Sequence, residues 1–144
     1  RTLADPLTQR IRELRESAGQ TTNRPRVFVE IWHDPLNTAG KDSFLSELVY
    51  LAGSRNIGDE VDKDYFQVDP EWIVARNPEV ILCFYMTSSS SPRQFVLQRS
   101  GWTSIAAVKN SRVYDGFDNN IMLRPGPRVL EGIEALRKAI HSEP

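Results

Sequence analysis

The alternation of apolar and polar positions along this chain predicts helices and strands that follow one another in turn. An apolar stripe with helical spacing runs from Leu3 to Ala18. Residues 27–32 then form a β-branched and aromatic run, interrupted by Glu30, that is typical of a buried strand. The helical spacing returns between Phe44 and Ala52 and predicts a second helix, which Gly53 is well placed to end in a left-handed cap.

The second half of the chain repeats this alternation. Residues 79–85 are a nearly continuous apolar run, as expected of a buried parallel strand. Pro70 and Pro92 are favourable first positions for two short helices on either side of it. Residues 112–114 predict a third strand, and Pro127 opens a last helix with an apolar stripe. The pattern therefore predicts an α/β fold, a three-layer Rossmann-like lobe with a mostly parallel central sheet flanked by helices.

Three segments without regular periodicity follow the three predicted strands, and we expect them to meet at one edge of the sheet. In open α/β sheets, ligands bind outside the carboxyl ends of the strands. The segments carry aromatic, thioether and amide groups, which suit a large, partly apolar ligand with polar edges. A role in the core is the plain alternative for Trp32, and filling a gap is the alternative for Met122. The side chains concerned are Trp32, His33, Asn37 and Thr38, then Tyr85, Met86 and the following serines, then Phe117, Asn119, Asn120, Met122 and Arg124.

Composition narrows the function classes. The 144 residues, 40% hydrophobic and 26% charged, suit one globular unit with a proper core. The formal net charge of -1 gives no electrostatic reason to propose nucleic acid or a membrane surface as a partner. Cys83 is the only cysteine, so an internal disulfide and a cysteine-rich zinc site are excluded. Its place within an apolar run predicts an inert, buried thiol.

Catalytic motifs are missing from the sequence. It contains no glycine-rich nucleotide loop and no Gly-x-Ser-x-Gly elbow. The two histidines, His33 and His141, lie in no metal-binding frame, and the acidic segment 58–64 lacks calcium-loop spacing. We therefore predict no catalytic residue, no metal ligand and no cofactor. A catalytic pair of His33 and Asp34, in a small α/β enzyme, is the alternative.

Several segments, in this order and spacing, resemble the carboxy-terminal lobe of helical-backbone periplasmic binding proteins. These proteins serve ABC importers of cobalamin, ferric siderophores and haem. The resemblance covers the chain from about Pro25 to its end. The segments are PRVFVEI at 25–31, TAGKDSFL at 38–45, LAGSRNI at 51–57, VDPEWIVARNPEVI at 68–81, Trp102, AVKNSRVY at 107–114 and RPGPRVL at 124–130.

The resemblance implies that the chain consists of two structural segments. Residues 1–24 would be the end of the long inter-lobe helix and its connection, and residues 25–144 the ligand-binding lobe. The amino-terminal lobe of the same protein would then be missing here. The ligand of this family lies between the two lobes, so the chain would hold half of a site.

The implied function is non-covalent capture of a metal chelate outside the cytoplasm and its delivery to ABC permease subunits. The expected ligand is cobalamin or another corrinoid, or a ferric siderophore, with haem third. A sensing domain that keeps the fold without transport is a further alternative. The ligand-facing residues that the resemblance implies are Trp32, His33, Asn37, Tyr85, Met86, Asn120, Met122 and Arg124.

Overall fold

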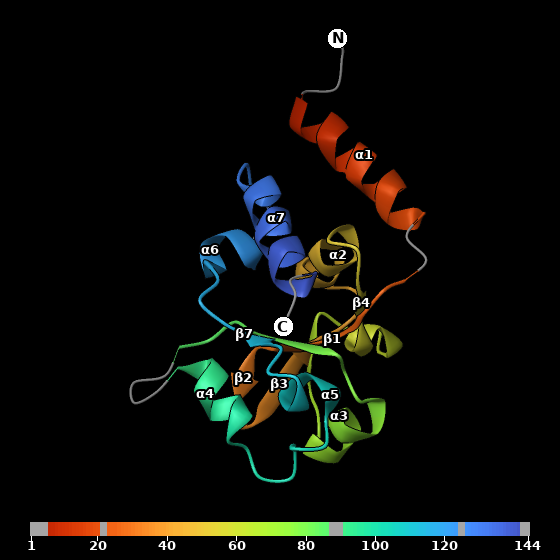
Figure 1. The fold of residues 1–144 in the computed structure, drawn as a ribbon. Helices are drawn as coiled ribbons and strands as arrows, with labels where there is room; N and C mark the ends of the chain where they lie inside the picture. The colour runs from red at the N-terminus through yellow and green to blue at the C-terminus, as the bar shows by residue number, and fades with distance from the viewer. Residues whose placement is uncertain (1–5, 21–22, 87–90, 124–125, 142–144) are drawn as a thin grey trace.

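A parallel sheet of four strands forms the centre of the computed structural model, which describes residues 6–20, 23–86, 91–123 and 126–141 (Figure 1). The strand order is β4-β1-β6-β7. Val27 of β1 lies opposite Val80 of β6, and Ile81 of β6 lies opposite Val113 of β7. The strands are β1 (Arg26–Glu30), β4 (Arg55–Asn56), β6 (Val80–Cys83) and β7 (Val113–Tyr114). The predicted α/β class with a mostly parallel sheet is confirmed.

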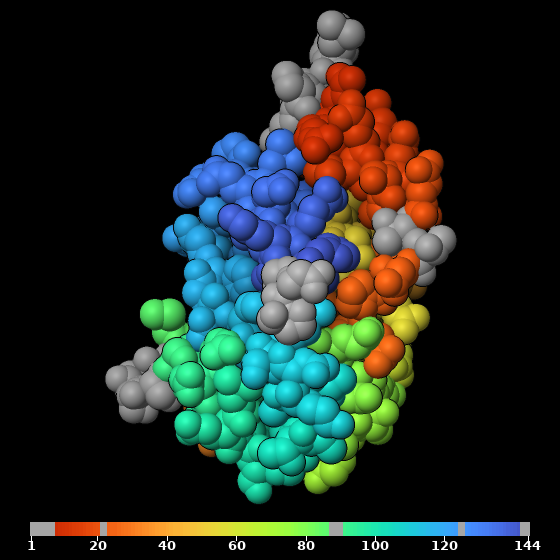
Figure 2. All heavy atoms as spheres, viewed as in Figure 1, coloured from red at the N-terminus to blue at the C-terminus, as the bar shows by residue number. Residues whose placement is uncertain are grey.

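Helices cover both faces of this sheet, because side chains alternate between the faces along each strand. Val27 and Val29 point into a core shared with α1 (Pro6–Gly19), α2 (Phe44–Leu51), α6 (Asn119–Met122) and α7 (Val129–Ile140). Phe28 and Ile81 point into a second core with α3 (Pro70–Arg76), α4 (Pro92–Leu97) and α5 (Ala106–Lys109). In Figure 2, α1 and α7 cover the upper half of the molecule, and α4 and α5 cover much of the lower half.

Most helix ends follow from local chemistry. The Ser43 hydroxyl accepts a hydrogen bond from the backbone N–H of Ser46 and caps α2. Gly53, at φ +86°, terminates this helix as predicted. Asn77 adopts the left-handed conformation after α3, and its side-chain oxygen accepts a hydrogen bond from the N–H of Ala106 at 2.8 Å. The segment predicted as an acidic loop contains the 3-10 helix η1 (Ile57–Glu60).

The segment that carries Trp32, His33, Asn37 and Thr38 was expected to lack regular structure, and this expectation is wrong. β2 (Trp32–His33) and β3 (Leu36–Ala39) form a hairpin around Asp34-Pro35, and β3 also pairs with β5 (Tyr65–Gln67). The result is a small antiparallel sheet of order β2-β3-β5. Its strands are two to four residues long, and an alternation of apolar and polar residues cannot be recognised in so short a stretch of sequence.

Two further boundaries differ from the sequence prediction. The segment 116–126 was expected to be irregular, but it contains α6, whose first turn is capped by the Asp118 carboxylate accepting from the N–H of Asn120 at 2.9 Å. A single helical turn has no visible period in the sequence. The last helix begins at Val129 rather than at Pro127. The division of the chain at residue 24 stays a prediction.

Candidate functional site

The carboxyl ends of β1, β6 and β7 share one edge of the sheet, because these strands are parallel. Four aromatic rings meet there, and we call them the aromatic rim: Trp32, His33, Tyr85 and Phe95. The ring of His33 lies 4.5 Å from that of Trp32, 5.3 Å from that of Tyr85 and 5.0 Å from that of Phe95, measured between centroids. The rings of Trp32 and Tyr85 meet edge to face at 5.7 Å. The structure thus joins the first two predicted loops into one surface.

This surface is accessible to a ligand at its outer rings. Trp32 is 42% exposed and Phe95 39% exposed, whereas Tyr85 is buried beneath them. Met86, which directly follows Tyr85, is 80% exposed. Exposed rings held in a fixed arrangement offer flat apolar contact area to a large ligand.

A buried charged network lies under the aromatic rim and consists of Glu30, Tyr85 and Arg99. The guanidinium of Arg99 donates from Nη1 to Oε1 and from Nη2 to Oε2 of Glu30, each at 2.8 Å. The phenol of Tyr85 donates to Oε2 of the same carboxylate at 2.5 Å. Glu30 is 0% exposed, so this carboxylate is satisfied entirely within the protein.

Burial and the charge of Glu30 shift the pKa values of Tyr85, Arg99 and the nearby Cys83. Burial, followed by the charge of Glu30 and the hydrogen bond to it, raises the pKa of Tyr85, so the phenol stays neutral. Burial alone would lower the pKa of Arg99, but the hydrogen bonds and the charge of Glu30 outweigh it and raise this pKa. Burial and the charge of Glu30 also raise the pKa of the Cys83 thiol. Cys83 is a buried, free thiol, as predicted.

The third segment reaches the same edge through Asn119 and Phe117, two of the side chains expected there. The side-chain amide of Asn119 donates to the carbonyl of Phe84 at 2.8 Å, and the ring of Phe117 stacks on that of Phe84 at 5.0 Å. Asn120 is exposed. Met122 is 2% exposed and packs in the core, as its gap-filling alternative would have it, so its side chain faces away from the surface.

Two other predicted residues contribute less to the surface. The amide of Asn37 donates to the carbonyl of Pro35 at 3.1 Å and so supports the hairpin turn. Arg124 lies outside the described residues.

Sequence reasoning missed Phe95, Glu30 and Arg99 as parts of this site. Phe95 was read as a position in a helix, and Glu30 as an interruption of a strand. A charged residue within a run of buried strand residues was the one available signal, because a buried carboxylate needs a partner.

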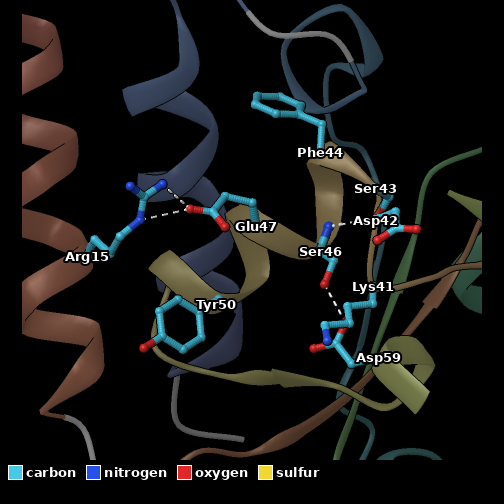
Figure 3. A pocket seen from close by; sticks show the side chains of 9 residues that line it. All are labelled: Arg15, Lys41, Asp42, Ser43, Phe44, Ser46, Glu47, Tyr50 and Asp59. Atoms are coloured by element: carbon cyan, nitrogen blue, oxygen red, sulfur yellow. Dashed lines mark hydrogen bonds and ion pairs between the residues drawn. The ribbon is translucent and has the colours of Figure 1, made fainter. Parts of the chain in front are cut away.

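Apart from this surface, a hollow of about 700 Å³ lies between α1 and α2 (Figure 3). Charged and aromatic side chains both line it, and Arg15 of α1 forms an ion pair with Glu47 of α2 there. Ser46 donates its hydroxyl hydrogen to Asp59 at 2.5 Å on the same wall. The hollow is lined by Arg15, Lys41, Asp42, Ser43, Phe44, Ser46, Glu47, Tyr50 and Asp59.

The residues that the structure describes include neither a cluster of metal ligands nor a membrane-spanning helix. Across those residues, no three or more His, Cys, Asp or Glu side chains lie close enough to hold a metal ion. Within the same ranges, none of the helices combines the length and the apolar character needed to cross a bilayer.

Comparison with known proteins identifies relatives across most of the chain. A sequence profile of the periplasmic binding protein family matches residues 1–119. An uncharacterized ABC transporter substrate-binding lipoprotein of Bacillus subtilis is 36% identical over 118 residues, which are 81% of this chain and 36% of that protein. The vitamin B12-binding protein of Vibrio cholerae is 28% identical over 132 residues, which are 91% of this chain and 45% of that protein. The chain therefore spans less than half the length of both relatives.

A solved structure agrees with these sequence matches. The crystal structure of a possible iron-binding (periplasmic solute-binding) protein from Staphylococcus epidermidis superposes with a TM-score of 0.81 and 30% identity. The match covers 96% of this chain and 53% of the other chain. Almost the whole described fold is thus found in about half of a longer protein.

Proposed function

Since the chain belongs to the periplasmic binding protein family, we propose that it is the carboxy-terminal ligand-binding lobe of the substrate-binding component of an ABC importer. Its ligand is a metal chelate, either a corrinoid such as cobalamin or a ferric siderophore. The sequence similarity to a vitamin B12-binding protein and to a possible iron-binding protein supports this ligand class. In this proposal the protein works outside the cytoplasm, and its partners are the permease subunits and a second, amino-terminal lobe.

The aromatic rim is the observation on which the proposal depends. A chelate of this size presents flat or rounded apolar faces edged with amides or carbonyls, and exposed rings of Trp32 and Phe95 match such faces. His33 adds an imidazole, and Met86 a flexible thioether, beside these rings. The mechanism is capture without covalent change: the ligand rests on the rim, the second lobe covers it, and the permease receives it.

A binding measurement tests this proposal. The full-length protein is titrated by calorimetry with cyanocobalamin, ferrioxamine and haemin. We expect one probe to bind saturably and Trp32→Ala to weaken it by about tenfold, which corresponds to about 1.4 kcal/mol and is the order expected for one aromatic contact. Tyr65→Ala is the matched control, because Tyr65 is also 42% exposed but lies on β5 away from the rim contacts.

Two results would contradict the proposal. Folded protein that binds none of the three probes would remove the metal-chelate assignment. Equal weakening by Trp32→Ala and Tyr65→Ala would remove the aromatic rim from the binding surface. Chemical conversion of a probe that is abolished by His33→Ala would instead favour the enzyme that uses His33 and Asp34.

A further inference from the structure

Burial of the ion pair of Glu30 and Arg99 costs desolvation free energy. Glu30 is 0% exposed and the Arg99 side chain 15% exposed, so both charges have lost most of their hydration. Replacing such a pair by well-packed apolar residues is often neutral or stabilises a protein by about 1–4 kcal/mol. Stability alone therefore does not account for a carboxylate in the central strand.

The carboxylate of Glu30 is connected to every ring of the aromatic rim through at most two contacts. It accepts a hydrogen bond directly from the phenol of Tyr85 and holds the guanidinium of Arg99 with two more. That guanidinium lies over the ring of Phe95, 5.2 Å from its centroid, and 4.3 Å from the centroid of the buried Trp102. Tyr85 and Phe95 then contact His33 from two sides, and Tyr85 also contacts Trp32.

The position of Tyr85 in the chain makes this side-chain support important. The N–H of Phe84 donates to the carbonyl of Glu30 at 3.0 Å, directly beyond the end of β6 at Cys83. Tyr85 comes one residue later. Its phenol oxygen is fixed by a hydrogen bond to a carboxylate that is itself fixed by two others. A charge-assisted hydrogen bond of this kind is roughly twice as strong as one between neutral groups, and a bidentate pair also fixes geometry.

We propose that Glu30 and Arg99 are positioning residues that hold the four rings of the aromatic rim in one arrangement, so that the rim is ready for its ligand before binding. The part of this proposal that concerns binding rests on the proposed function. The part that concerns ring positions does not. A rim already fixed in the free protein loses less side-chain freedom when a ligand binds, and this strengthens binding.

Two measurements separate the positioning of the rings from ligand binding. Fluorine NMR of protein labelled with 5-fluorotryptophan reports the ring positions, and titration with a probe reports binding. The chain has three tryptophans, and Trp32→Phe assigns the resonance of the rim. Tyr85→Phe removes only the hydroxyl group, and Glu30→Leu combined with Arg99→Met replaces the pair by apolar groups without leaving a lone buried charge. Trp72 is the internal reference, since it contacts Phe66 of β5 and Arg76 of α3 rather than the rim. Tyr65→Phe is the control for loss of a phenol elsewhere.

We expect both network variants to shift and broaden the Trp32 resonance while that of Trp72 stays in place. The probe that binds the wild-type protein should then bind them about tenfold more weakly, and Tyr65→Phe should change neither quantity. An unmoved Trp32 resonance in both variants would overturn the positioning role. A moved resonance with unchanged probe affinity would overturn its part in binding. If no probe binds the wild-type protein, the proposed function fails, while the Trp32 resonance still decides the positioning role.

Discussion

At the residue scale, the same type of ion pair occurs in this protein in two very different settings. Arg99 and Glu30 form a bidentate pair under the aromatic rim with the carboxylate fully buried. Arg128 and Glu131 form a bidentate pair with similar distances on the surface, where both side chains are more than half exposed. Solvent screens the second pair and leaves the first unscreened, so their contributions should differ strongly.

Glu30→Ala is expected to lower the free energy of unfolding by about 3–5 kcal/mol, because it leaves the Arg99 guanidinium buried without its partner. Glu131→Ala, the matched control, should leave the unfolding midpoint nearly unchanged. Urea denaturation followed by circular dichroism measures both. A small effect of Glu30→Ala would mean that water reaches Arg99 in the folded protein.

Two residues next to this pair, Cys83 and Tyr85, make the free energy of unfolding depend on pH in the alkaline range. The pKa values of Cys83 and Tyr85 are raised in the folded protein, mainly by burial. Their contribution is fully present below the pKa values of the unfolded chain, which are about 8.5 for cysteine and about 10 for tyrosine. As the pH rises past these values, the unfolded chain releases protons that the folded protein retains, so the free energy of unfolding falls.

We expect the loss to begin near pH 8.5 and to reach a slope of about 1.4 kcal/mol per pH unit for each group that ionises only in the unfolded state. Urea titrations between about pH 7 and 10 measure this slope. Cys83→Ala should reduce it over the lower part of the range. An identical slope in wild type and variant would show that the thiol ionises equally in both states.

At the scale of elements, a close backbone contact joins the small antiparallel sheet to the central one. Gly58 of η1 lies so near β3 that an added Cβ would be 2.1 Å from the carbonyl oxygen of Ala39. The amide of Asn56 donates to the same carbonyl at 2.9 Å. The hairpin that carries Trp32 and His33 is therefore anchored at its far end by groups that leave no room for a side chain.

Gly58→Ala should lower the free energy of unfolding by about 1–3 kcal/mol, because backbone must move to admit the methyl group. Gly126→Ala is the control, since nothing lies within 4 Å of a Cβ added there. Thermal unfolding compares the two variants. Equal melting temperatures would mean that η1 shifts away from β3 at little cost.

The elements that the sequence predicted well are those with long or uniform patterns. β1, β6, α2 and α7 each bury a continuous run or a stripe, and periodicity detects both. The hairpin of β2 and β3 escaped prediction because its strands are short and owe their pairing to β5, almost thirty residues later.

The candidate site shows the same limit. Trp32, His33 and Tyr85 could be predicted because they follow strands whose carboxyl ends must meet. Glu30 could not be recognised, because its partners Tyr85 and Arg99 are 55 and 69 residues away in the chain. Phe95 joins the rim from a helix, and helical spacing alone does not tell which face of α4 meets β2.

At the scale of the whole molecule, α1 is attached less firmly than the other long helices. Within the described part of α1, Leu14 and Ala18 are the buried side chains, and Arg15 adds an exposed ion pair with Glu47. Figure 1 shows the first turns of α1 extending away from the layered part of the fold.

Hydrogen exchange should therefore be uneven. We expect backbone amides in the first half of α1 to exchange faster than those of β1 and β6, because few buried contacts oppose opening there. Mass spectrometry of peptides after exchange measures this difference. Equal protection of α1 and the central strands would show that the helix has support beyond Leu14 and Ala18.

The strand order has a consequence for the path to the folded state. β1 pairs with β4 and with β6, and Val27 lies opposite Val80, which is 53 positions later in the sequence. β7, at residues 113–114, completes the sheet at its edge. Closing the large loops between these strands costs conformational entropy before the strand pairing contributes favourable free energy. Folding should therefore be slow compared with that of helical proteins of the same size. On the ribosome, β1 is made before β6, so one side of β1 lacks its partner strand until about fifty further residues have been added.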